Sequence, residues 1–383
     1  MDVVILMNKY AMFKADNYQA DELYKIIKKH FEVHDIKDDI PKNAKVLLKP
    51  NLVSDKDAFF SVTTNPNFVF AVIRCLNEIG IKDIIIADCP GGSVLLFSQM
   101  MDVYKKTGYE FLSEYAKLNV NFESSDIYTS EGFQNKKFNV INLINNVDYV
   151  ISLPKLKTHN ITCMTAAVKN LFGCIPGLQK PAFHAKYPNA SDFSNMLVEL
   201  ALTVKCDFTI VDAIDIMEGN GPANGQKRHL GLTFSSKDIF TLDALIAKTV
   251  GIPSEKVKTI SASEKKGLIH KDAELTGDTD FRINSPILLP GSIGAVTASG
   301  KISANIDLLR GKLNDLFFSF YPHMNDNCTL CRKCVATCPV KALSVKNDKI
   351  VLNKKVCIGC LCCDEMCPNA AVDIKRSFGK KQR

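Results

Sequence analysis

Several features that assign a protein to a common class are missing from this sequence. No stretch approaches 18 consecutive apolar residues, so no membrane-spanning helix is expected. Asp2 stands where a signal peptide would carry positive charge, and no long apolar segment follows it, so no secretory signal is expected. The chain also lacks a Walker A sequence, a G-x-S-x-G serine motif and an H-E-x-x-H zinc motif. P-loop, serine-hydrolase and zinc-peptidase chemistry are therefore not predicted.

The positive charge of the chain gives little support for nucleic acid as a partner. The 383 residues carry a net charge of +7, but from Cys328 onward 12 Lys and Arg residues accompany only 4 Asp and Glu residues, so the rest of the chain is nearly neutral. The sequence contains no nucleic-acid recognition motif. With 46% hydrophobic and 23% charged residues, the composition is that of a soluble globular protein large enough for two or three domains.

Eight of the 14 cysteines form two matching runs near the C-terminus. The runs begin at Cys328 and Cys357, 29 residues apart, and each has the spacing C-x2-C-x2-C-x3-C-P. This spacing is typical of bacterial ferredoxins that hold two [4Fe–4S] clusters. Zinc sites seldom repeat four such cysteines, and disulfide frameworks suit small secreted chains. The tail therefore predicts an iron–sulfur module whose basic residues offset the negative charge of the thiolate-bound clusters.

In such modules each cluster takes three cysteines from one run and the fourth from the other run. The predicted ligands are Cys328, Cys331, Cys334 and Cys367 for the first cluster, and Cys357, Cys360, Cys363 and Cys338 for the second. Cys362 lies beside a ligand but outside the spacing, so we predict that it binds no iron. The body cysteines are interpreted mainly as structural residues. A redox or metal-binding role is kept as the alternative for three of them, Cys89, Cys163 and Cys174.

The chain before residue 320 alternates strand-like and helix-like segments. Strands are expected at 45–48, 83–87, 147–153 and 208–211, and helices over 18–31 and from Asn65-Pro66 to Gly80. This alternation predicts an α/β fold in which a mostly parallel sheet carries helices on both faces. The tail predicts a small α+β two-cluster ferredoxin-like domain. We place the two domains at residues 1–321 and 322–383.

Three further segments are assigned from shorter patterns. Residues 3–7 predict a strand, and residues 283–299 predict a small β segment with glycine and proline turns. Residues 301–321 predict a helix that connects the two domains.

Polar loops follow four of the predicted strands. In parallel sheets ligands bind beyond the carboxyl ends of the strands, so these loops predict a site at that edge. The sequence blocks are, in order, Lys49-Pro50-Asn51-Leu52, Thr64-Asn65-Pro66, Asp88-Cys89-Pro90-Gly91-Gly92, Pro154-Lys155-Leu156-Lys157-Thr158-His159, Val168-Lys169-Asn170-Leu171-Phe172-Gly173, Asp212-Ala213-Ile214 and Met217-Glu218-Gly219-Asn220-Gly221-Pro222. The series resembles the DUF362 family over about residues 40–255.

This resemblance implies an α/β fold, a site in the matching loops and a fused two-cluster ferredoxin module. It implies no substrate, because the chemistry of the family is poorly defined. Two thiols depart from the expected pattern, since Cys89 stands where the family has serine and Cys174 follows Phe172-Gly173. A looser likeness to the N-terminal domain of lactate-racemase-like proteins is an analogy of fold only.

Basic residues gather in these loops. If the loops meet at one edge of the sheet, they form a cationic pocket in which lysines hold a carboxylate or phosphate. We predict that Lys157 and His159 are catalytic, with His159 as the leading proton donor. The predicted substrate-binding residues are Lys49, Asn51, Asp88, Lys155, Lys169, Asn170, Asp212 and Glu218. The alternatives are solvated surface lysines, a structural histidine at 159, and a weaker acid–base candidate at His184.

The three acidic residues of this set have two interpretations. Carboxylates at strand ends hold a divalent cation or balance lysines. Asp88 and Asp212 also suit the ordinary use of aspartate after a strand, which is to cap a turn or helix. Both interpretations remain open at this stage.

The combined pattern predicts a cytoplasmic iron–sulfur oxidoreductase. Two [4Fe–4S] clusters would receive electrons from a ferredoxin or reductase partner and pass them to a small anionic substrate or second cofactor on the α/β domain. The alternatives are a non-catalytic electron-transfer subunit or redox sensor that docks on a partner enzyme, and a non-redox enzyme with structural clusters. Oxygen-sensitive clusters and unpaired thiols favour a reducing compartment.

Overall fold

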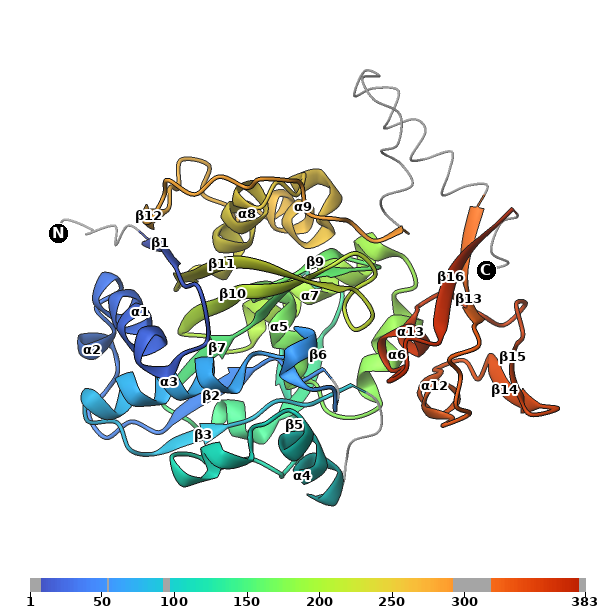
Figure 1. Ribbon diagram of the computed structural model, residues 1–383, viewed down its shortest axis with the longest axis horizontal. Helices are drawn as coiled ribbons and strands as arrows, with labels where there is room; N and C mark the ends of the chain where they lie inside the picture. Colours follow the sequence, from blue (N-terminus) through green and yellow to red (C-terminus); the bar gives the residue numbers. More distant parts are fainter. Residues whose placement is uncertain (1–7, 54, 92–96, 292–317, 379–383) are drawn as a thin grey trace.

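The computed structural model describes residues 8–53, 55–91, 97–291 and 318–378 (Figure 1). Residues 8–291 form an α/β body, and residues 318–378 form a smaller unit that we call the ferredoxin segment. No helix of the described residues is both long enough and apolar enough to cross a membrane.

The body is built on a mixed sheet of ten strands. Its order is β12-β1-β11-β10-β7-β2-β3-β4, and β8 and β9 extend from β10. The run from β10 to β4 is parallel throughout, whereas β11 is antiparallel to both β10 and β1. The strands are β1 Tyr10–Lys14, β2 Val46–Pro50, β3 Ile84–Ile86, β4 Lys117–Leu118, β7 Tyr149–Leu153, β8 Lys155–His159, β9 Cys163–Thr165, β10 Phe208–Glu218, β11 Gln226–Ser236 and β12 Thr276–Gly277. A separate hairpin joins β5 Ser124–Tyr128 to β6 Lys137–Ile141.

Helices cover both faces of this sheet (Figure 1). The first face carries α1 Ala20–Val33, α2 Ile36–Asp39, α3 Pro66–Glu78 and α4 Phe97–Lys106. The second face carries α5 Ala167–Asn170, α7 Ala190–Thr203, α8 Ile239–Thr249 and α9 Lys258–Lys265. The α/β class and the mostly parallel sheet predicted from the sequence are therefore confirmed.

The central strands are buried on both faces, and their side chains divide between two cores. In β2, Leu47 packs into the core of the second face, while Val46 and Leu48 pack into the core of the first. Because side chains of a strand alternate between faces, a strand buried on both sides must be apolar throughout. The apolar residues 46–48 of β2 meet this requirement. They place the next residue, Lys49, at the edge of the sheet where the parallel strands end.

Local sequence explains where α3 begins and ends. The Asn65 side chain accepts a hydrogen bond from the backbone N–H of Asn67, and Pro66 occupies the first turn. This cap satisfies one of the free N–H groups at a helix start. Gly80 follows the helix with φ of +93°, a conformation that favours glycine. The predicted limits of this helix agree with the structure within a few residues.

The ferredoxin segment contains two small two-stranded sheets and two short helices. Strands β13 Phe318–Met324 and β16 Val372–Phe378 pair antiparallel, as do β14 Leu343–Lys346 and β15 Lys349–Leu352. The helices are α12 Lys333–Thr337 and α13 Cys362–Glu365. Each helix begins one residue after a position with positive φ, Arg332 and Leu361. These two residues are 29 apart, so the sequence repeat is also a backbone repeat.

Several short-pattern predictions differ from the structure. Residues 283–291 contain no strand, and the end of the predicted connecting helix, 318–321, is the start of β13. The predicted boundary at 321/322 therefore falls inside a strand. Residues 3–7, 292–299 and 301–317 lie outside the described residues, and the first described strand is β1, which the sequence pattern did not reveal.

Candidate functional site

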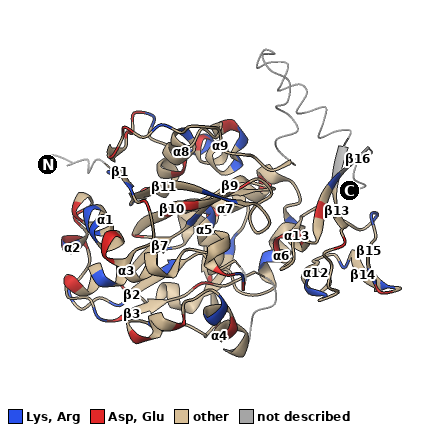
Figure 2. Cartoon of the chain, in the orientation of Figure 1, with Lys and Arg blue, Asp and Glu red and all other residues tan. Residues whose placement is uncertain are grey.

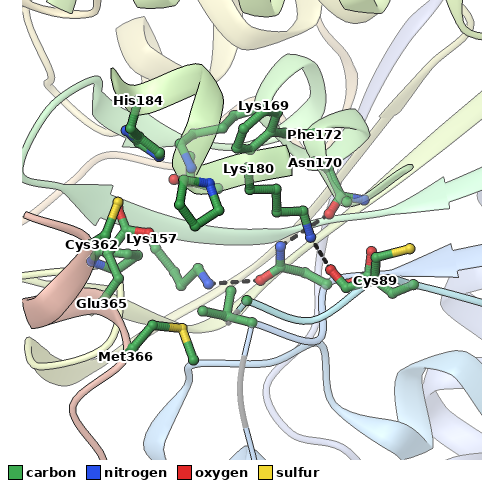
Figure 3. A pocket seen from close by; sticks show the side chains of 18 of the residues that line it. Cys89, Lys157, Lys169, Asn170, Phe172, Lys180, His184, Cys362, Glu365 and Met366 are labelled. Carbon is green, nitrogen blue, oxygen red and sulfur yellow. Dashed lines mark hydrogen bonds between the residues drawn. The ribbon is translucent and has the colours of Figure 1, made fainter. Parts of the chain in front are cut away.

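A cavity of about 80 Å³ lies between the body and the ferredoxin segment, and we call it the site cavity (Figure 3). The body contributes the loops that follow β2 and β3, together with β8, α5 and the helix α6 Gln179–Lys186. The ferredoxin segment contributes α12 and α13 with the adjoining Met366. The parallel strands bring the predicted loops together at one edge, and a second domain closes them from outside.

Three lysines line the site cavity. Lys157 Nζ donates to Asn51 Oδ1 at 2.7 Å and to Val62 O at 2.6 Å. Lys180 Nζ donates to the backbone oxygens of Cys89 and Pro90. Lys169 lies 5.9 Å from the centre of the Phe172 ring and extends from α5 toward the same space (Figure 3). The lysines therefore come from β8, α5 and α6 and converge on one cavity.

Burial changes the acidity of these lysines. It lowers the pKa of Lys169 and Lys180, because a charged ammonium loses its hydration in the interior. Burial also lowers the pKa of Lys157 well below its usual range, and the positive charge of Lys169 adds to that effect. An anion bound among the three lysines would favour their charged forms, and so would oppose both the effect of burial and the repulsion from Lys169.

Two carboxylates also line the cavity, and they differ in pairing. Asp88 Oδ1 lies 2.7 Å from Lys49 Nζ, and its other oxygen accepts from the Leu52 N–H at 2.7 Å, so this charge is already neutralised. Glu365 reaches in from α13 (Figure 3). Burial alone would raise the pKa of Glu365, but nearby His159 and Lys169 hold it well below its usual range. Of these two carboxylates, only Asp88 is therefore paired with a lysine. Glu365 shares the cavity with Lys157, Lys169 and Lys180 but forms no ion pair with any of these three.

His159 does not line the site cavity but lies behind Glu365. Its Nε2 is 3.0 Å from Glu365 Oε1, and its Nδ1 accepts from the N–H groups of Ile161 and Thr162 at 3.0 and 3.4 Å. These N–H groups leave Nδ1 without a proton, so the neutral ring carries its hydrogen on Nε2. Burial lowers the pKa of His159 to about 4. Any acid–base role of this histidine would have to pass through Glu365.

His184 lines the cavity directly. It extends from α6, and its ring stacks on Phe193 at 4.2 Å between centroids. Burial lowers its pKa to about 4, so the ring is neutral near pH 7. A neutral imidazole can donate or accept a hydrogen bond at the cavity surface.

The ferredoxin segment is held against the body by the residue before Glu365. Asp364 is buried, and its carboxylate accepts from Asn160 Nδ2 at 2.8 Å and from Asn224 Nδ2 at 2.7 Å. Burial raises the pKa of Asp364 to about 7. Met366 packs against Gly91, where an added Cβ would lie 2.6 Å from the methionine sulfur. Asp364 thus anchors the segment to the body, and the nearby Met366 closes one side of the cavity.

Lys49 and His159 do not line the site cavity, and three more predicted site residues, Lys155, Asp212 and Glu218, also lie outside its lining. Lys155 Nζ pairs with Asp212 Oδ2 at 2.8 Å and contacts the hydroxyl of Tyr18 at 2.6 Å, in a buried network that does not line the site cavity. Glu218 pairs with Arg228 at 3.1 Å and accepts from the Leu288 N–H at 2.9 Å. These arrangements are satisfied internally, which is typical of structural ion pairs.

Two predicted amides connect the lysines of the site. Asn51 Nδ2 donates to Asn170 Oδ1 at 3.1 Å, while Asn170 Nδ2 donates to Ser152 Oγ at 2.9 Å and to Lys49 O at 3.2 Å. Both asparagines line the cavity. Because each donates and accepts, together they fix the position of Lys157 relative to β2.

The eight cysteines of the two runs line two further cavities, which we call the first and second cysteine cavities. The first is lined by Cys328, Cys331, Cys334 and Cys367, and the second by Cys338, Cys357, Cys360 and Cys363. Among the described residues, no three His, Cys, Asp or Glu side chains converge as ligands of a single metal ion. The division follows the predicted ligand sets, and the ligation itself stays a prediction.

The cysteine cavities have features that fit iron–sulfur clusters. The N–H groups of Ala342 and Ala371 donate to the sulfurs of Cys338 and Cys367, both at 3.1 Å. Backbone N–H bonds to sulfur stabilise a thiolate and tune the potential of the cluster it holds. Each donor lies four residues after its cysteine, so the two halves provide the same environment.

Cys362 lines both the second cysteine cavity and the site cavity. It is buried and lies between two predicted ligands of the second cluster, Cys360 and Cys363. The two cavities therefore share a wall one residue thick at this position. In the part of the chain that the structure describes, the site cavity and the first cysteine cavity have no lining residue in common.

The body cysteines are poor candidates for reactive thiols. Cys89 lines the site cavity, but burial raises its pKa to about 12, and burial raises the pKa of Cys174 to about 12 as well. A thiol that stays protonated is a weak nucleophile and a weak metal ligand. These values favour the structural interpretation of both residues.

Sequence reasoning missed several residues of the site cavity. Lys180 was not selected, although it lies only a few residues after the Val168–Gly173 block. Glu365, Thr337 and Cys362 were missed because the sequence does not show that α12 and α13 face the body. One signal was present, since Asp364-Glu365 are adjacent acids in a tail that is otherwise strongly basic.

Comparison with known proteins gives two family matches. Residues 46–248 match the family described as "Domain of unknown function (DUF362)", and residues 322–368 match a "4Fe-4S dicluster domain". The first match covers the body loops that line the site cavity, from Asn51 to Pro222.

Individual proteins show the same division. The chain is 31% identical to the thylakoid-associated protein sll1697 of Synechocystis sp. over 273 residues, which are 71% of this chain and 83% of that protein. The tail is 35% identical to a ferredoxin of Methanothermococcus thermolithotrophicus over 46 residues, 12% of this chain and 77% of the ferredoxin. Among solved structures, the lactate racemase apoprotein from Thermoanaerobacterium thermosaccharolyticum has 13% identity and a TM-score of 0.41, covering 64% of this chain and 58% of that one.

Proposed function

The chain belongs to the DUF362 family, and we propose that it is an oxidoreductase that passes electrons from two [4Fe–4S] clusters to a small anion in the site cavity. Its ferredoxin-type domain is an iron–sulfur, electron-transferring domain. The observation that carries the proposal is Cys362, which belongs to the walls of both the second cysteine cavity and the site cavity. An electron leaving the second cluster would meet the site cavity across this single residue.

The residues of the chain would divide the work as follows. The eight tail cysteines would hold the clusters, which supply electrons one at a time. Lys169 and Lys180 would hold the anion, while Lys157 would be kept in place by Asn51. The enclosing α12 and α13 would exclude water, which strengthens these charge interactions.

Protons would come from groups at the cavity surface. Lys169 lines it directly, and its lowered pKa makes its ammonium a stronger acid than an exposed lysine, whereas the neutral ring of His184 would serve as a hydrogen-bond partner. The proton-donor role predicted for His159 is kept as a route through Glu365, at the 3.0 Å contact between them. In this arrangement His159 is a positioning residue for Glu365.

A redox partner protein is expected to deliver the electrons. Figure 2 shows Lys and Arg over α12 and the β14–β15 hairpin of the ferredoxin segment. Cys331 is exposed and lines the first cysteine cavity, so a docked partner would reach this cavity from the surface. A partner with an acidic surface would be steered to this domain by charge. The reducing cytoplasm remains the proposed compartment, because clusters and unpaired thiols persist there.

Replacing Lys169 by methionine should weaken anion binding about ten- to a hundredfold. A hydrogen bond to a charged group is worth roughly 1.5–3 kcal/mol, and methionine keeps the length of the side chain without its charge. Calorimetric titration of the anaerobic, cluster-loaded protein with acetate and with phosphate would measure the change. Reoxidation of dithionite-reduced clusters by a panel of small anions would report turnover.

The matched control is Lys25→Met, which removes the same charge from an exposed position of α1. It should leave binding, iron content and cluster reoxidation as in the unmodified protein. If Lys169→Met and Lys25→Met bind anions equally well, the site cavity is not the anion site and the proposal fails.

Anion binding should weaken as the pH rises. The pKa of Lys169 lies below its ordinary value of 10.5, so its ammonium loses its proton at a lower pH than an exposed lysine does. A bound anion favours the charged form and raises that pKa, so binding takes up protons over the interval between the two values. Titrations in buffers of different ionisation enthalpy should detect this uptake, and the uptake should be smaller in Lys169→Met. An affinity independent of pH up to 10.5 would contradict the expectation.

One observation supports the second candidate function, an electron-transfer subunit without chemistry of its own. Phe59 and Phe60, in the short helix η1 Ala58–Phe60, are 67% and 56% exposed. Adjacent exposed aromatic side chains are common where proteins dock. In that case the purified chain would transfer electrons to a partner enzyme and bind no small anion.

A further inference from the structure

Three polar groups of the site cavity have no hydrogen-bond partner. Within the described ranges, no hydrogen bond or ion pair involves the Lys169 ammonium. The Thr165 side chain is 3% exposed, and its Oγ1 has no partner in the described structure. Glu365 Oε1 lies 3.0 Å from His159 Nε2, but within the described ranges no hydrogen bond or ion pair involves its other oxygen, Oε2. All three residues line the site cavity.

Unpaired buried groups of this kind are costly. Leaving a buried donor or acceptor unsatisfied costs about 1–3 kcal/mol, and charged groups cost more. Several other polar groups around the cavity are paired, among them Lys157 with Asn51, and Asp88 with Lys49. The groups that lack a partner are therefore the ones that a ligand in the cavity would contact.

The unmet groups also differ in sign. Lys169 offers only hydrogen-bond donors, whereas the carboxyl oxygens of Glu365 offer acceptors. A simple anion such as acetate would satisfy Lys169 but would bring a second negative group close to Glu365. A ligand that carries both an anionic group and a hydrogen-bond donor would satisfy both Lys169 and Glu365. It would also offer the Thr165 hydroxyl a hydrogen-bond partner.

We propose that the ligand of the site cavity is a small anion that carries its own hydrogen-bond donor, a hydroxyl or an ammonium group. This inference rests on the proposed function and specifies the chemistry by which the site recognises its ligand, not the step that the electrons carry out. The anionic group lies on Lys169, and the donor lies on Glu365. The cavity, with a volume of about 80 Å³, has room for a small ligand of this kind.

The arrangement also orients the ligand. Glu365 belongs to α13, the helix that begins at Cys362 in the wall of the second cysteine cavity. Lys169 belongs to α5 of the body. The carbon that bears the donor therefore faces the second cysteine cavity, and the anionic group faces the body.

Matched ligands that differ by one hydroxyl test the proposal. Glycolate and acetate form one pair, and 3-hydroxypropionate and propionate form the other. Titration of the anaerobic, cluster-loaded full chain should give at least about tenfold tighter binding for one hydroxy acid than for its matched acid, since a site with an unpaired acceptor discriminates against a ligand that lacks the donor. Glycine, with an ammonium donor, is a further probe against acetate.

Two variants assign the discrimination to Glu365. Glu365→Met removes the acceptor at similar size and should bring the two members of a pair to equal affinity. Glu365→Gln keeps an acceptor oxygen and should retain part of the preference. Iron content and the cluster absorption spectrum of both variants would establish that the ferredoxin segment is intact, and the glutamine variant carries the test if the methionine variant loses its clusters.

Each outcome has a separate meaning. Equal binding of both members of each pair to the unmodified chain would overturn the inference while leaving an anion site in place. A preference that persists in Glu365→Met would overturn the role of Glu365. Binding of none of these anions would remove the proposed function itself, and this inference with it.

Discussion

Replacing Gly173 by alanine should lower the free energy of unfolding of the body by about 3–5 kcal/mol, the usual cost of breaking a buried ion pair. An added Cβ would overlap the carboxylate of Asp88 and lie 2.5 Å from Lys49 Nζ. These two groups form an ion pair of 2.7 Å whose side chains are 4% and 1% exposed. The alanine methyl would have to separate them or move the short helix η4 Leu171–Cys174 that contains Gly173.

Neither adjustment is easy for the structure. The Gly173 oxygen accepts from the Cys89 N–H at 2.9 Å, which ties η4 to the loop after β3. Asp88 also accepts from the Leu52 N–H at 2.7 Å, so its displacement would break a second bond. A charge left without its partner in this interior would have no water to solvate it.

Thermal unfolding followed by circular dichroism would measure the effect of Gly173→Ala. Gly291→Ala is the control, because the nearest atom to its added Cβ, Asn220 Oδ1, lies 3.8 Å away, an ordinary contact. The control should unfold within about 0.5 kcal/mol of the unmodified chain. If Gly173→Ala is as stable as the control, then the Lys49–Asp88 pair can separate without penalty and does not organise this edge of the sheet.

This pair also illustrates what the sequence could predict. Lys49 and Asp88 were both placed at the carboxyl ends of adjacent strands, and β2 and β3 do lie side by side. Their position followed from the parallel sheet, because all carboxyl ends meet at one edge. The ion pair between Lys49 and Asp88 could not be predicted in this way. The positions of lysines in a sequence do not show whether a lysine is free to bind a ligand or is already paired with a carboxylate.

Lys155 and Lys169 also differ in whether they are paired, and the sequence did not show this difference. Both were predicted to bind the substrate, yet Lys155 contacts Asp212 and Tyr18, while Lys169 faces the cavity without an ion pair among the described residues. The two lysines lie on β8 and α5, and their directions depend on how these elements pack. Side-chain direction of this kind is set by tertiary contacts, which a single sequence does not display.

The part of the site that sequence could not predict is its outer wall. Glu365 and Lys157 are about half the chain apart, and contacts such as those of Asp364 with Asn160 and Asn224 bring them to one cavity. The cysteine spacing predicted the ferredoxin module but said nothing of which face it turns to the body. The contact between domains converts an open strand-end edge into an enclosed cavity beside Cys362.

Each predicted cluster takes one cysteine from the other run, and we call this arrangement the crossed pairing. It leads to a prediction about how much iron two double variants retain. Cys338 belongs to the first run but lines the second cysteine cavity, and Cys367 of the second run lines the first. With two [4Fe–4S] clusters, the chain should bind about eight irons. The predicted ligand sets then give opposite outcomes for two double variants that each remove a pair of cysteines.

Cys338→Ala combined with Cys357→Ala removes two ligands of the same predicted cluster and should leave about four irons per chain. Cys338→Ala combined with Cys328→Ala removes one ligand from each cluster and should leave far fewer than four. An uncrossed pairing, in which each run holds its own cluster, reverses these two results. Iron and sulfide analysis after anaerobic reconstitution, with the cluster absorption as a second measure, separates the two pairings. Cys206→Ala, which removes a body cysteine outside all three cavities, is the control and should retain about eight irons.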